Sequence, residues 1–322
     1  MTVASPRFLQ LHHEDHAAVR DELRAGLARR PALVSPKYLY DPLGSRLFDA
    51  ITELPEYYPT RTEAAIFAEH GVAMGDALRV AIGERYSWVD LGAGDGAKSA
   101  RLFAVSRPSR YVAVDISVAY LREAVSRLAR EHPTIEMIGL GLDFSTHLAL
   151  PPGLVEGPAV IFYPGSSIGN FAPEQALALL SQAREASQGG ALLIGVDLVK
   201  AKAVLEPAYD DALGVTAAFN LNLLTHINAL IGADFRVRDW SHRAFFDEGQ
   251  SRIEMHLQAK RDVTVGFDGG QRRFAEGERI HTENSYKWTL GAFETLLRDA
   301  GWREPRHWCD ERGWFAVFMA RA

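Results

Sequence analysis

The sequence predicts an α/β protein built around a parallel, doubly wound sheet. Apolar segments alternate with helix-forming segments over residues 85–199, and strands joined in this way by helices are buried on both faces. The first strand ends in the glycine-rich stretch 92–96, while Asp115, Asp143 and Asn170 follow the next three strands. Ligands of wound sheets bind where the strands end, so we expect these residues to line one crevice.

The chain before the sheet predicts a helix and then a loop segment with many aromatic residues. Residues 14–30 favour a helix, because Val19, Leu23 and Leu27 recur at every fourth position and give it one buried face. Four tyrosines and four prolines share residues 35–63, and rigid turns that present phenols suit the wall of a binding site. We expect two of the four tyrosines only to pack against the core. The tyrosines are Tyr38, Tyr40, Tyr57 and Tyr58.

The later elements are predicted in chain order. Strands are expected at 86–91, 110–115, 135–140, 159–163, 191–196 and 314–320, with helices from Ala97, from an N-cap at Ser117, from Pro173 and over 289–300. After Lys200 the alternation stops, and a helical stretch over 208–231 precedes a β pattern over 235–267. We therefore predict a sheet domain of residues 62–199 and 288–322. A second α+β lobe of residues 1–61 and 200–287 would carry the substrate site.

Composition excludes several classes of protein. The 322 residues carry a net charge of −6 and no basic face, which argues against nucleic-acid binding. No apolar run approaches the roughly 20 residues that span a bilayer, and the single cysteine, Cys309, excludes an internal disulfide. The histidines near His12 and His16 fail the H-E-x-x-H zinc pattern at Ala17, so we expect no metal site. A cytoplasmic monomer is expected.

The glycine-rich stretch predicts a nucleoside site. Its pattern is G-x-G-x-G with Asp90 before it, which differs from the dinucleotide fingerprint, and an acid there would repel a pyrophosphate. Asp115 follows Gly96 by 19 residues, a spacing that suits a carboxylate on the ribose hydroxyls. We expect Asp90 to lie near a cationic ligand. S-adenosylmethionine carries a sulfonium and an ammonium group, so we favour it over a nicotinamide. A glycine turn in an unrelated α/β protein remains the alternative.

Methyl transfer needs alignment rather than a nucleophile from the enzyme. An amide oxygen that accepts an N–H would aim a nitrogen lone pair at the methyl group, and Asn170 stands where that group is wanted, unless it only forms a turn. Asp143 is placed to accept a hydrogen bond from the exocyclic amine of an adenine, and Phe144 is placed to stack on its ring. Alternatively, Asp143 caps a helix and Phe144 packs in the core. Lys98 is within reach of the donor's carboxylate, unless it is an ordinary surface lysine.

Six runs of the sequence resemble the histidine-specific N-alpha-methyltransferases of ergothioneine biosynthesis. They are Lys37–Asp41, Leu54–Glu63, Gly165–Asn170, Ala208–Asn220, Arg252–Met255 and Thr282–Ser285. The resemblance extends from about residue 20 to the C-terminus. It implies a class I methyltransferase with a Rossmann-like sheet, which uses S-adenosylmethionine to trimethylate the α-amino group of L-histidine to hercynine.

The resemblance also implies roles for individual residues. Tyr57, Asn170 and Tyr209 would hold the amino acid's carboxylate and amine, with Tyr40 near the amine and the donor. Glu283 and Ser285 would bind the imidazole, and Met255 would line the same pocket. The donor residues would be Gly92, Gly94, Lys98, Asp115, Asp143 and Phe144. Ser167, Asn284 and Tyr286 depart from the family's pattern.

Three alternatives to a histidine methyltransferase are open. The same chemistry on tyrosine, tryptophan or a histidine derivative is disfavoured by Glu283, because a buried acid against an indole or phenyl ring is costly. A nicotinamide-dependent oxidoreductase would bind NADH in place of S-adenosylhomocysteine. A protein that keeps the nucleoside pocket without catalysis would bind S-adenosylhomocysteine but methylate no amino acid.

Overall fold

The computed structural model describes residues 5–11, 15–116 and 118–322, which fall into two compact units. Unit 1 comprises the described residues up to 11, together with 61–198 and 288–322. Unit 2 comprises 15–60 and 199–287. Ser117, expected as a helix cap, and His12, at the N-terminal histidine cluster, lie outside the described residues.

Unit 1 is built on one eight-stranded sheet with the strand order β1-β5-β4-β3-β6-β7-β14-β13. The strands from β1 to β7 pair in parallel, whereas β14 is antiparallel to both of its neighbours. Their bounds are β1 (Arg7–Gln10), β3 (Ser87–Leu91), β4 (Arg110–Asp115), β5 (Glu136–Gly141), β6 (Ala159–Tyr163), β7 (Ala191–Asp197), β13 (Arg303–Cys309) and β14 (Phe315–Arg321). The predicted α/β doubly wound fold is confirmed, with strand order reversing between β3 and β6.

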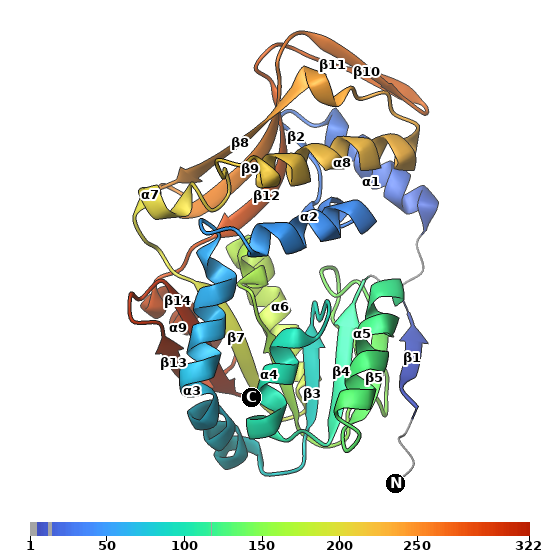
Figure 1. Cartoon of the computed structure of the whole chain (residues 1–322). Coiled ribbons are helices and arrows are strands. Elements are labelled where there is room, and N and C mark those ends of the chain that lie inside the picture. The colour runs from blue at the N-terminus through green and yellow to red at the C-terminus, as the bar shows by residue number, and fades with distance from the viewer. Residues whose placement is uncertain (1–4, 12–14, 117) are drawn as a thin grey trace. The chain divides into compact units, whose positions relative to one another are not determined.

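Two strands at the sheet edges correct the sequence prediction. Residues 1–61 were assigned to the second lobe, but β1 pairs in parallel with β5 and belongs to unit 1 (Figure 1). Phe8 explains the docking, since Gly139 leaves room for its ring: a Cβ there would lie 2.7 Å from Phe8 Cδ1. Strand β13 pairs with β14 and was not predicted, because its exposed charged residues hide any alternation.

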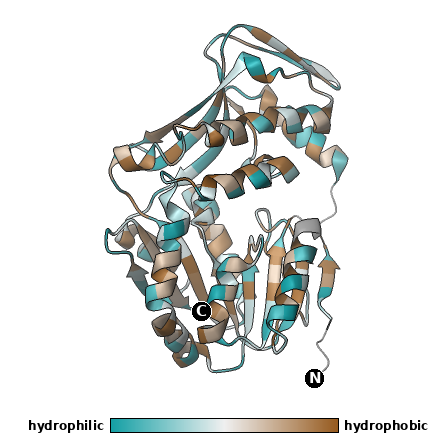
Figure 2. Ribbon diagram, in the orientation of Figure 1, coloured by the Kyte–Doolittle hydropathy of each residue, from teal (hydrophilic) through white to brown (hydrophobic). Residues whose placement is uncertain are grey.

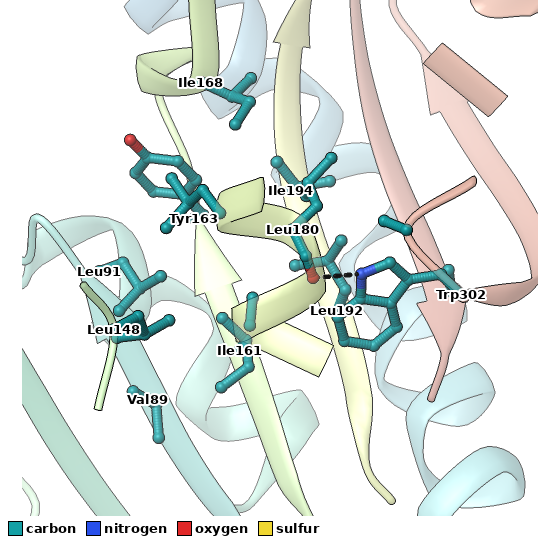
Figure 3. Close-up of a cluster of buried hydrophobic side chains, with 14 of the residues drawn as sticks. Val89, Leu91, Leu148, Ile161, Tyr163, Ile168, Leu180, Leu192, Ile194 and Trp302 are labelled. Carbon is teal, nitrogen blue, oxygen red and sulfur yellow. Dashed lines mark hydrogen bonds between the residues drawn. The ribbon is translucent and has the colours of Figure 1, made fainter. Parts of the chain in front are cut away.

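Five helices cover the two faces of this sheet. They are α3 (Tyr58–Ile82), α4 (Ala97–Ser106), α5 (Val118–Glu131), α6 (Pro173–Ala186) and α9 (Leu290–Asp299). Side chains of α3, α4 and α5 pack with Trp88 and Phe162 on one face, while α6 and α9 pack on the other. On that second face Trp302 Nε1 donates to the carbonyl of Leu180 at 3.0 Å (Figure 3). In Figure 2 helix α5 carries both teal and brown stretches, as an amphipathic helix does; its predicted apolar face, with Leu121 among its residues, is buried.

Unit 2 combines helices with a four-stranded sheet of order β2-β12-β9-β8 and the hairpin β10-β11. The strands are β2 (Ala32–Leu33), β8 (Trp240–Asp247), β9 (Arg252–Ala259), β10 (Val263–Phe267), β11 (Gly270–Phe274) and β12 (Arg279–Tyr286). The helices are α1 (His16–Ala28), η1 (Pro36–Leu39), α2 (Pro42–Thr52), α7 (Lys202–Leu205), α8 (Val215–Ile231) and η3 (Val237–Asp239). Helix α8 packs against α1, α2, β8 and β9, so it forms the centre of this unit's core.

Helix α8 begins later than the sequence predicted. A helix from residue 208 was expected, but Gly214 has a left-handed φ of 77° and α8 starts at Val215. The carboxylate of Asp211 accepts hydrogen bonds from the backbone N–H groups of Val215 and Thr216, at 3.0 and 2.8 Å. These bonds satisfy donors that the first turn leaves free and lower the pKa of Asp211 against the opposing effect of burial.

Candidate active site

The loop after β3 builds a cradle in unit 1. Gly92, Gly94 and Gly96 all have left-handed φ values of 69°, 54° and 70°, which side chains rarely adopt. The Gly94 N–H donates to Asp115 Oδ2 at 3.0 Å, so the carboxylate at the end of β4 is held beside the loop. A Cβ on Gly94 would meet nothing within 4 Å. A ligand can therefore come close to the main chain at Gly94, next to a carboxylate, and this arrangement fits the ribose of a nucleoside.

Phe144 lies next to the same loop. A Cβ on Gly92 would lie 3.9 Å from Phe144 Cζ, and the Phe144 ring meets Tyr163 edge-on at 5.8 Å between centroids. The backbone N–H of Ser145 donates to Asp143 Oδ1 at 3.0 Å, so one carboxylate oxygen forms a turn. Phe144 therefore lies against the glycine loop and Tyr163, while one oxygen of Asp143 caps a local turn.

The expectation that Asp90 faces a cationic ligand is wrong. Its side chain is buried on the face of β3 that α4 covers, where Ser99 Oγ of α4 donates to it at 2.6 Å and the Tyr111 hydroxyl at 2.9 Å. Trp88 Nε1 donates in turn to Ser99 Oγ at 2.9 Å. Burial raises the pKa of Asp90 to about 7, against the effect of these hydrogen bonds. Asp90 therefore fixes the first strand to α4 instead of contacting a ligand.

Lys98 is held by a carboxylate that sequence reasoning missed. Lys98 Nζ lies 2.8 Å from Glu63 Oε2, and the N–H of Gly165 donates to Glu63 Oε1 at 2.7 Å. Glu63 is buried, and Gly195 leaves it room, because a Cβ there would lie 2.0 Å from Oε1. One side chain of α3 thus ties the helix after the glycine loop to the loop after β6. Glu63 stood inside a resembling run, but nothing in the run marked it as buried.

Asn170 lies in the turn that follows β6. This turn, η2 (Ser167–Asn170), starts after Ser166, whose φ is 56°. The Ser166 hydroxyl oxygen accepts a hydrogen bond from the backbone N–H of Asp197 at 2.8 Å, which fixes the turn against β7. The side chain of Asn170 is partly exposed. It therefore stands at the carboxyl end of β6, beside the point where the strand order reverses.

A buried polar cluster forms in unit 2. The hydroxyls of Tyr209 and Ser285 are 2.8 Å apart, and Lys287 Nζ donates to both of them at 2.9 and 2.8 Å. Glu283 stands two residues before Ser285 on β12, and it is 7% exposed with no partner for Oε2. Burial raises the pKa of Glu283 to about 7, although the charge of Lys287 lowers it. The cluster therefore combines hydroxyl groups, a cation and an unsatisfied carboxyl.

A β-bulge sets which side chains of β12 face this cluster. His281 pairs with His256 of β9, but Glu283 pairs with Met255, so Thr282 is an extra residue in the ladder. Side chains alternate along a strand, and one extra residue reverses their faces. Glu283 and Ser285 therefore share a face with buried Met255. Asn284 and Tyr286, the two departures from the family's pattern, stand on the opposite face.

Aromatic rings accompany the polar cluster. Tyr57 meets Tyr209 at 6.2 Å between ring centroids, and Phe48 of α2 meets Tyr57 at 6.1 Å and Tyr40 at 5.6 Å. Phe219 of α8 lies 5.5 Å from Tyr40. Of the four tyrosines in the loop segment, Tyr38 and Tyr58 are buried, whereas Tyr40 and Tyr57 are partly exposed. Two of them pack, as expected, and the other two belong to a ring set that Phe48 and Phe219 complete.

Each unit thus gathers its own share of the predicted site. Unit 1 holds Gly92, Gly94, Lys98, Asp115, Asp143, Phe144 and Asn170, and unit 2 holds Tyr40, Tyr57, Tyr209, Met255, Glu283 and Ser285. Lys287, Phe48, Phe219 and Glu63 join these groups without having been predicted. A signal for Lys287 was present, since it continues the alternation of Glu283 and Ser285 one residue past the end of β12.

Similarity to characterised proteins covers nearly the whole chain. The model of a family described as histidine-specific methyltransferase, SAM-dependent, matches residues 19–322. Histidine N-alpha-methyltransferases of Mycolicibacterium smegmatis and Mycobacterium tuberculosis are each 37% identical to this chain; the alignments cover 94% of both chains in the first case and 95% of both in the second. An N-methyltransferase of Aspergillus flavus is 27% identical over 91% of this chain and 82% of its own length.

These matches agree with the contents of unit 1. The glycine cradle, Asp115 and Phe144 in unit 1 fit a nucleoside, and the fold is that of a wound α/β sheet. Within the part of the chain that the structure describes, no helix is long and apolar enough to cross a membrane. The chain belongs to the family of histidine-specific, S-adenosylmethionine-dependent methyltransferases.

Proposed function

We propose that this enzyme transfers methyl groups from S-adenosylmethionine to the α-amino group of L-histidine, and that three transfers give hercynine, an intermediate of ergothioneine biosynthesis. The names of the two mycobacterial relatives support the substrate. The observation that carries the proposal is the buried carboxyl of Glu283, whose Oε2 has no partner and whose strand neighbour on the same face is Ser285. A neutral imidazole has one N–H donor and one acceptor nitrogen. A buried carboxylate can accept from the N–H, and a hydroxyl can donate to the other nitrogen.

The donor would be held by unit 1. We propose that Asp115 binds the ribose and that Phe144 and Asp143 bind the adenine. Gly92 and Gly94 would let the donor come close to the main chain. Lys98 would attract the donor's carboxylate while Glu63 fixes its Nζ. When bound, S-adenosylmethionine supplies a methyl group that the sulfonium has already activated. The protein's task is therefore to align the acceptor nitrogen and to exclude water.

Hydroxyl, amide and carboxyl groups of the protein's side chains would hold the amino acid substrate. We assign its carboxylate and amine to Tyr57, Tyr209 and Asn170, with Tyr40 near the amine. Asn170 would accept an amine hydrogen and so direct the nitrogen lone pair. Glu283 and Ser285 would bind the imidazole, with Met255 against the ring. Lys287, which donates to both Tyr209 and Ser285, would hold these two hydroxyls in place.

Other amino acids are the second candidate for the acceptor. A phenyl or indole ring would leave Glu283 without a partner in a buried place, at a cost of about 1–3 kcal/mol. Incubation of the enzyme with S-adenosylmethionine and each free amino acid, with S-adenosylhomocysteine release as the readout, tests the choice. We expect turnover of histidine well above that of tyrosine or tryptophan. Turnover of tryptophan without turnover of histidine would refute the proposal.

We further propose that the enzyme acts as a cytoplasmic monomer. The chain has a single cysteine, the partly buried Cys309, so it cannot form an internal disulfide. Its fold therefore does not depend on an oxidising compartment. Light scattering coupled to gel filtration tests the oligomeric state, and a mass twice that of the 35.6 kDa chain would contradict it.

Glu63 gives a prediction on donor binding. Glu63→Ala should raise the Kd for S-adenosylhomocysteine about tenfold, because it leaves Lys98 Nζ and the Gly165 N–H without their partner. Titration calorimetry measures the change. Glu69→Ala, on the exposed side of the same helix, is the matched control and should leave the Kd unchanged. Equal affinities in the two variants would show that Glu63 does not support the donor site.

Glu283 gives a prediction on stability and pH. Its pKa in the folded protein is about 7, above its ordinary value of 4.5, so between these pH values the folded state holds a proton that the unfolded state has released. The free energy of unfolding should therefore fall as pH rises through this window, by about 3 kcal/mol in all. Glu283→Gln should remove this part of the decline. Urea unfolding near pH 5 and near pH 8 checks it, and identical pH dependence in both proteins would contradict it.

A further inference from the structure

Three potential metal ligands meet on the face of the unit 2 sheet that points away from Glu283. Glu254 and His256 alternate on β9, and His281 stands opposite His256 on β12. The bulge at Thr282 creates this division, since it turns Glu283 to one face while His281 stays on the other. The three groups come from two strands, so no spacing in the sequence announces them, and the sequence-based expectation of no metal site considered only the N-terminal histidines. None of them belongs to the predicted donor or amino-acid site.

The separations suit one small cation. One ligand atom from each of the three side chains lies within 4.8 Å of the others. Glu254 Oε2 and His256 Nε2 are 2.8 Å apart, and His281 Nε2 and Asn284 Oδ1 are 2.9 Å apart. Bonds of roughly 2.0–2.1 Å to a tetrahedral Zn²⁺ would place its ligand atoms about 3.3 Å apart. Small side-chain rotations are therefore enough to admit an ion.

The surroundings prepare these groups for ligation. Nε2 of His256 contacts Glu254 Oε2, and Nε2 of His281 contacts Asn284 Oδ1, and both oxygens are acceptors. An ion at this place would therefore replace the protons that the two rings share with these oxygens. Arg252 Nε donates to Glu254 Oε1 at 2.8 Å, which leaves Oε2 to face the histidines. His256 is 8% exposed, and its Nδ1 has no hydrogen-bond partner. A ligand carboxylate held by a second group is typical of metal sites.

We propose that Glu254, His256 and His281 bind one divalent transition-metal ion, of which Zn²⁺ is the representative, with Asn284 Oδ1 or water as the fourth ligand. Two imidazoles and one carboxylate are a ligand set that zinc accepts. The guanidinium group of Arg252 opposes the ion's charge, so binding should be weaker than at a site without it. The ion would cross-link β9 to β12. This proposal is independent of the assigned substrate.

Titration of the chelator-treated full-length protein with Co²⁺ and Zn²⁺ tests the site. We expect one equivalent of Co²⁺ to give the intense visible absorption of four-coordinate cobalt, Zn²⁺ to displace it, and Zn²⁺ to raise the melting temperature by several degrees. His281→Gln should weaken Zn²⁺ binding at least about tenfold. His307→Gln is the matched control, because His307 also stands on a strand beside a glutamate, Glu294, at 3.4 Å.

Two results would overturn the proposal. The first is the absence of a stoichiometric cobalt spectrum with the unaltered protein. The second is equal zinc affinity in His281→Gln and in the unaltered protein. Should His281→Gln fail to fold, Glu254→Gln provides the same comparison, because it keeps the size of the side chain and an acceptor for Arg252.

Discussion

Replacing Glu283 by alanine should raise the Kd for L-histidine about 100-fold, while the Kd for S-adenosylhomocysteine changes by less than about twofold. The variant removes a buried carboxyl group, and a charge-assisted hydrogen bond in such a place contributes up to about 3 kcal/mol, which corresponds to a factor of about 100. Donor residues such as Asp115 belong to the other unit and keep their hydrogen bonds. Titration calorimetry with each ligand separates the two effects.

Glu254→Ala in metal-free protein is the control for this experiment. Glu254 stands on β9, opposite Asn284 on β12, and is 9% exposed, but it occupies the face of the sheet that turns away from Glu283. It should leave histidine affinity unchanged. Equal losses of histidine and donor affinity in Glu283→Ala would contradict the assignment of the imidazole to this residue, since they would indicate a general loss of structure.

Replacing Asn170 by alanine should lower kcat at saturating substrates about 100-fold. Misplacement of the acceptor by about 1 Å can cost a factor of this size, and the variant removes the amide oxygen that we assign to directing the amine. The affinity for S-adenosylhomocysteine should stay within about threefold, because Asp115 and the glycine loop are untouched. Rapid-quench measurement of the first methyl transfer reports the rate.

A structural role for Asn170 predicts a different outcome. It is the last residue of the η2 turn, and a turn-forming asparagine would affect the melting temperature more than the rate. An unchanged kcat together with a lower melting temperature would therefore reduce Asn170 to a turn residue. Asn170→Ser, which also forms turns but has no amide oxygen, separates the roles further: it should keep the stability and lose the rate.

Strands buried on both faces were the most predictable part of this fold. The five inner strands β3 to β7 are largely apolar, and each one ends in, or is followed at once by, a glycine, a proline or an acidic residue, so pattern alone located them. Strand β1 escaped notice because four residues at a sheet edge carry too little pattern, and its docking depends on Phe8 and Gly139, which are distant in sequence. The start of α8 depended on the cap made by Asp211, which composition could not reveal.

The site residues were predictable by type but not by environment. Asp90 and Asp115 both stand near the ends of strands, yet Asp90 is turned into the core by the alternation along β3 and only Asp115 reaches the glycine loop. The bulge at Thr282 sets the faces of Glu283 and His281, and no property of threonine announces a bulge. Glu63 and Lys287 gain their importance from burial next to partners far along the chain.

Tandem mass spectrometry of the product made from L-histidine and a methyl-deuterated donor tests the central claim most directly. The methyl groups should all be found on the α-nitrogen, because the ring is assigned to Glu283 and Ser285 and the amine to Asn170. Three labelled methyl groups on that nitrogen, with an unmodified imidazole, are the predicted result. Label on a ring nitrogen, or no labelled histidine at all, would contradict the account.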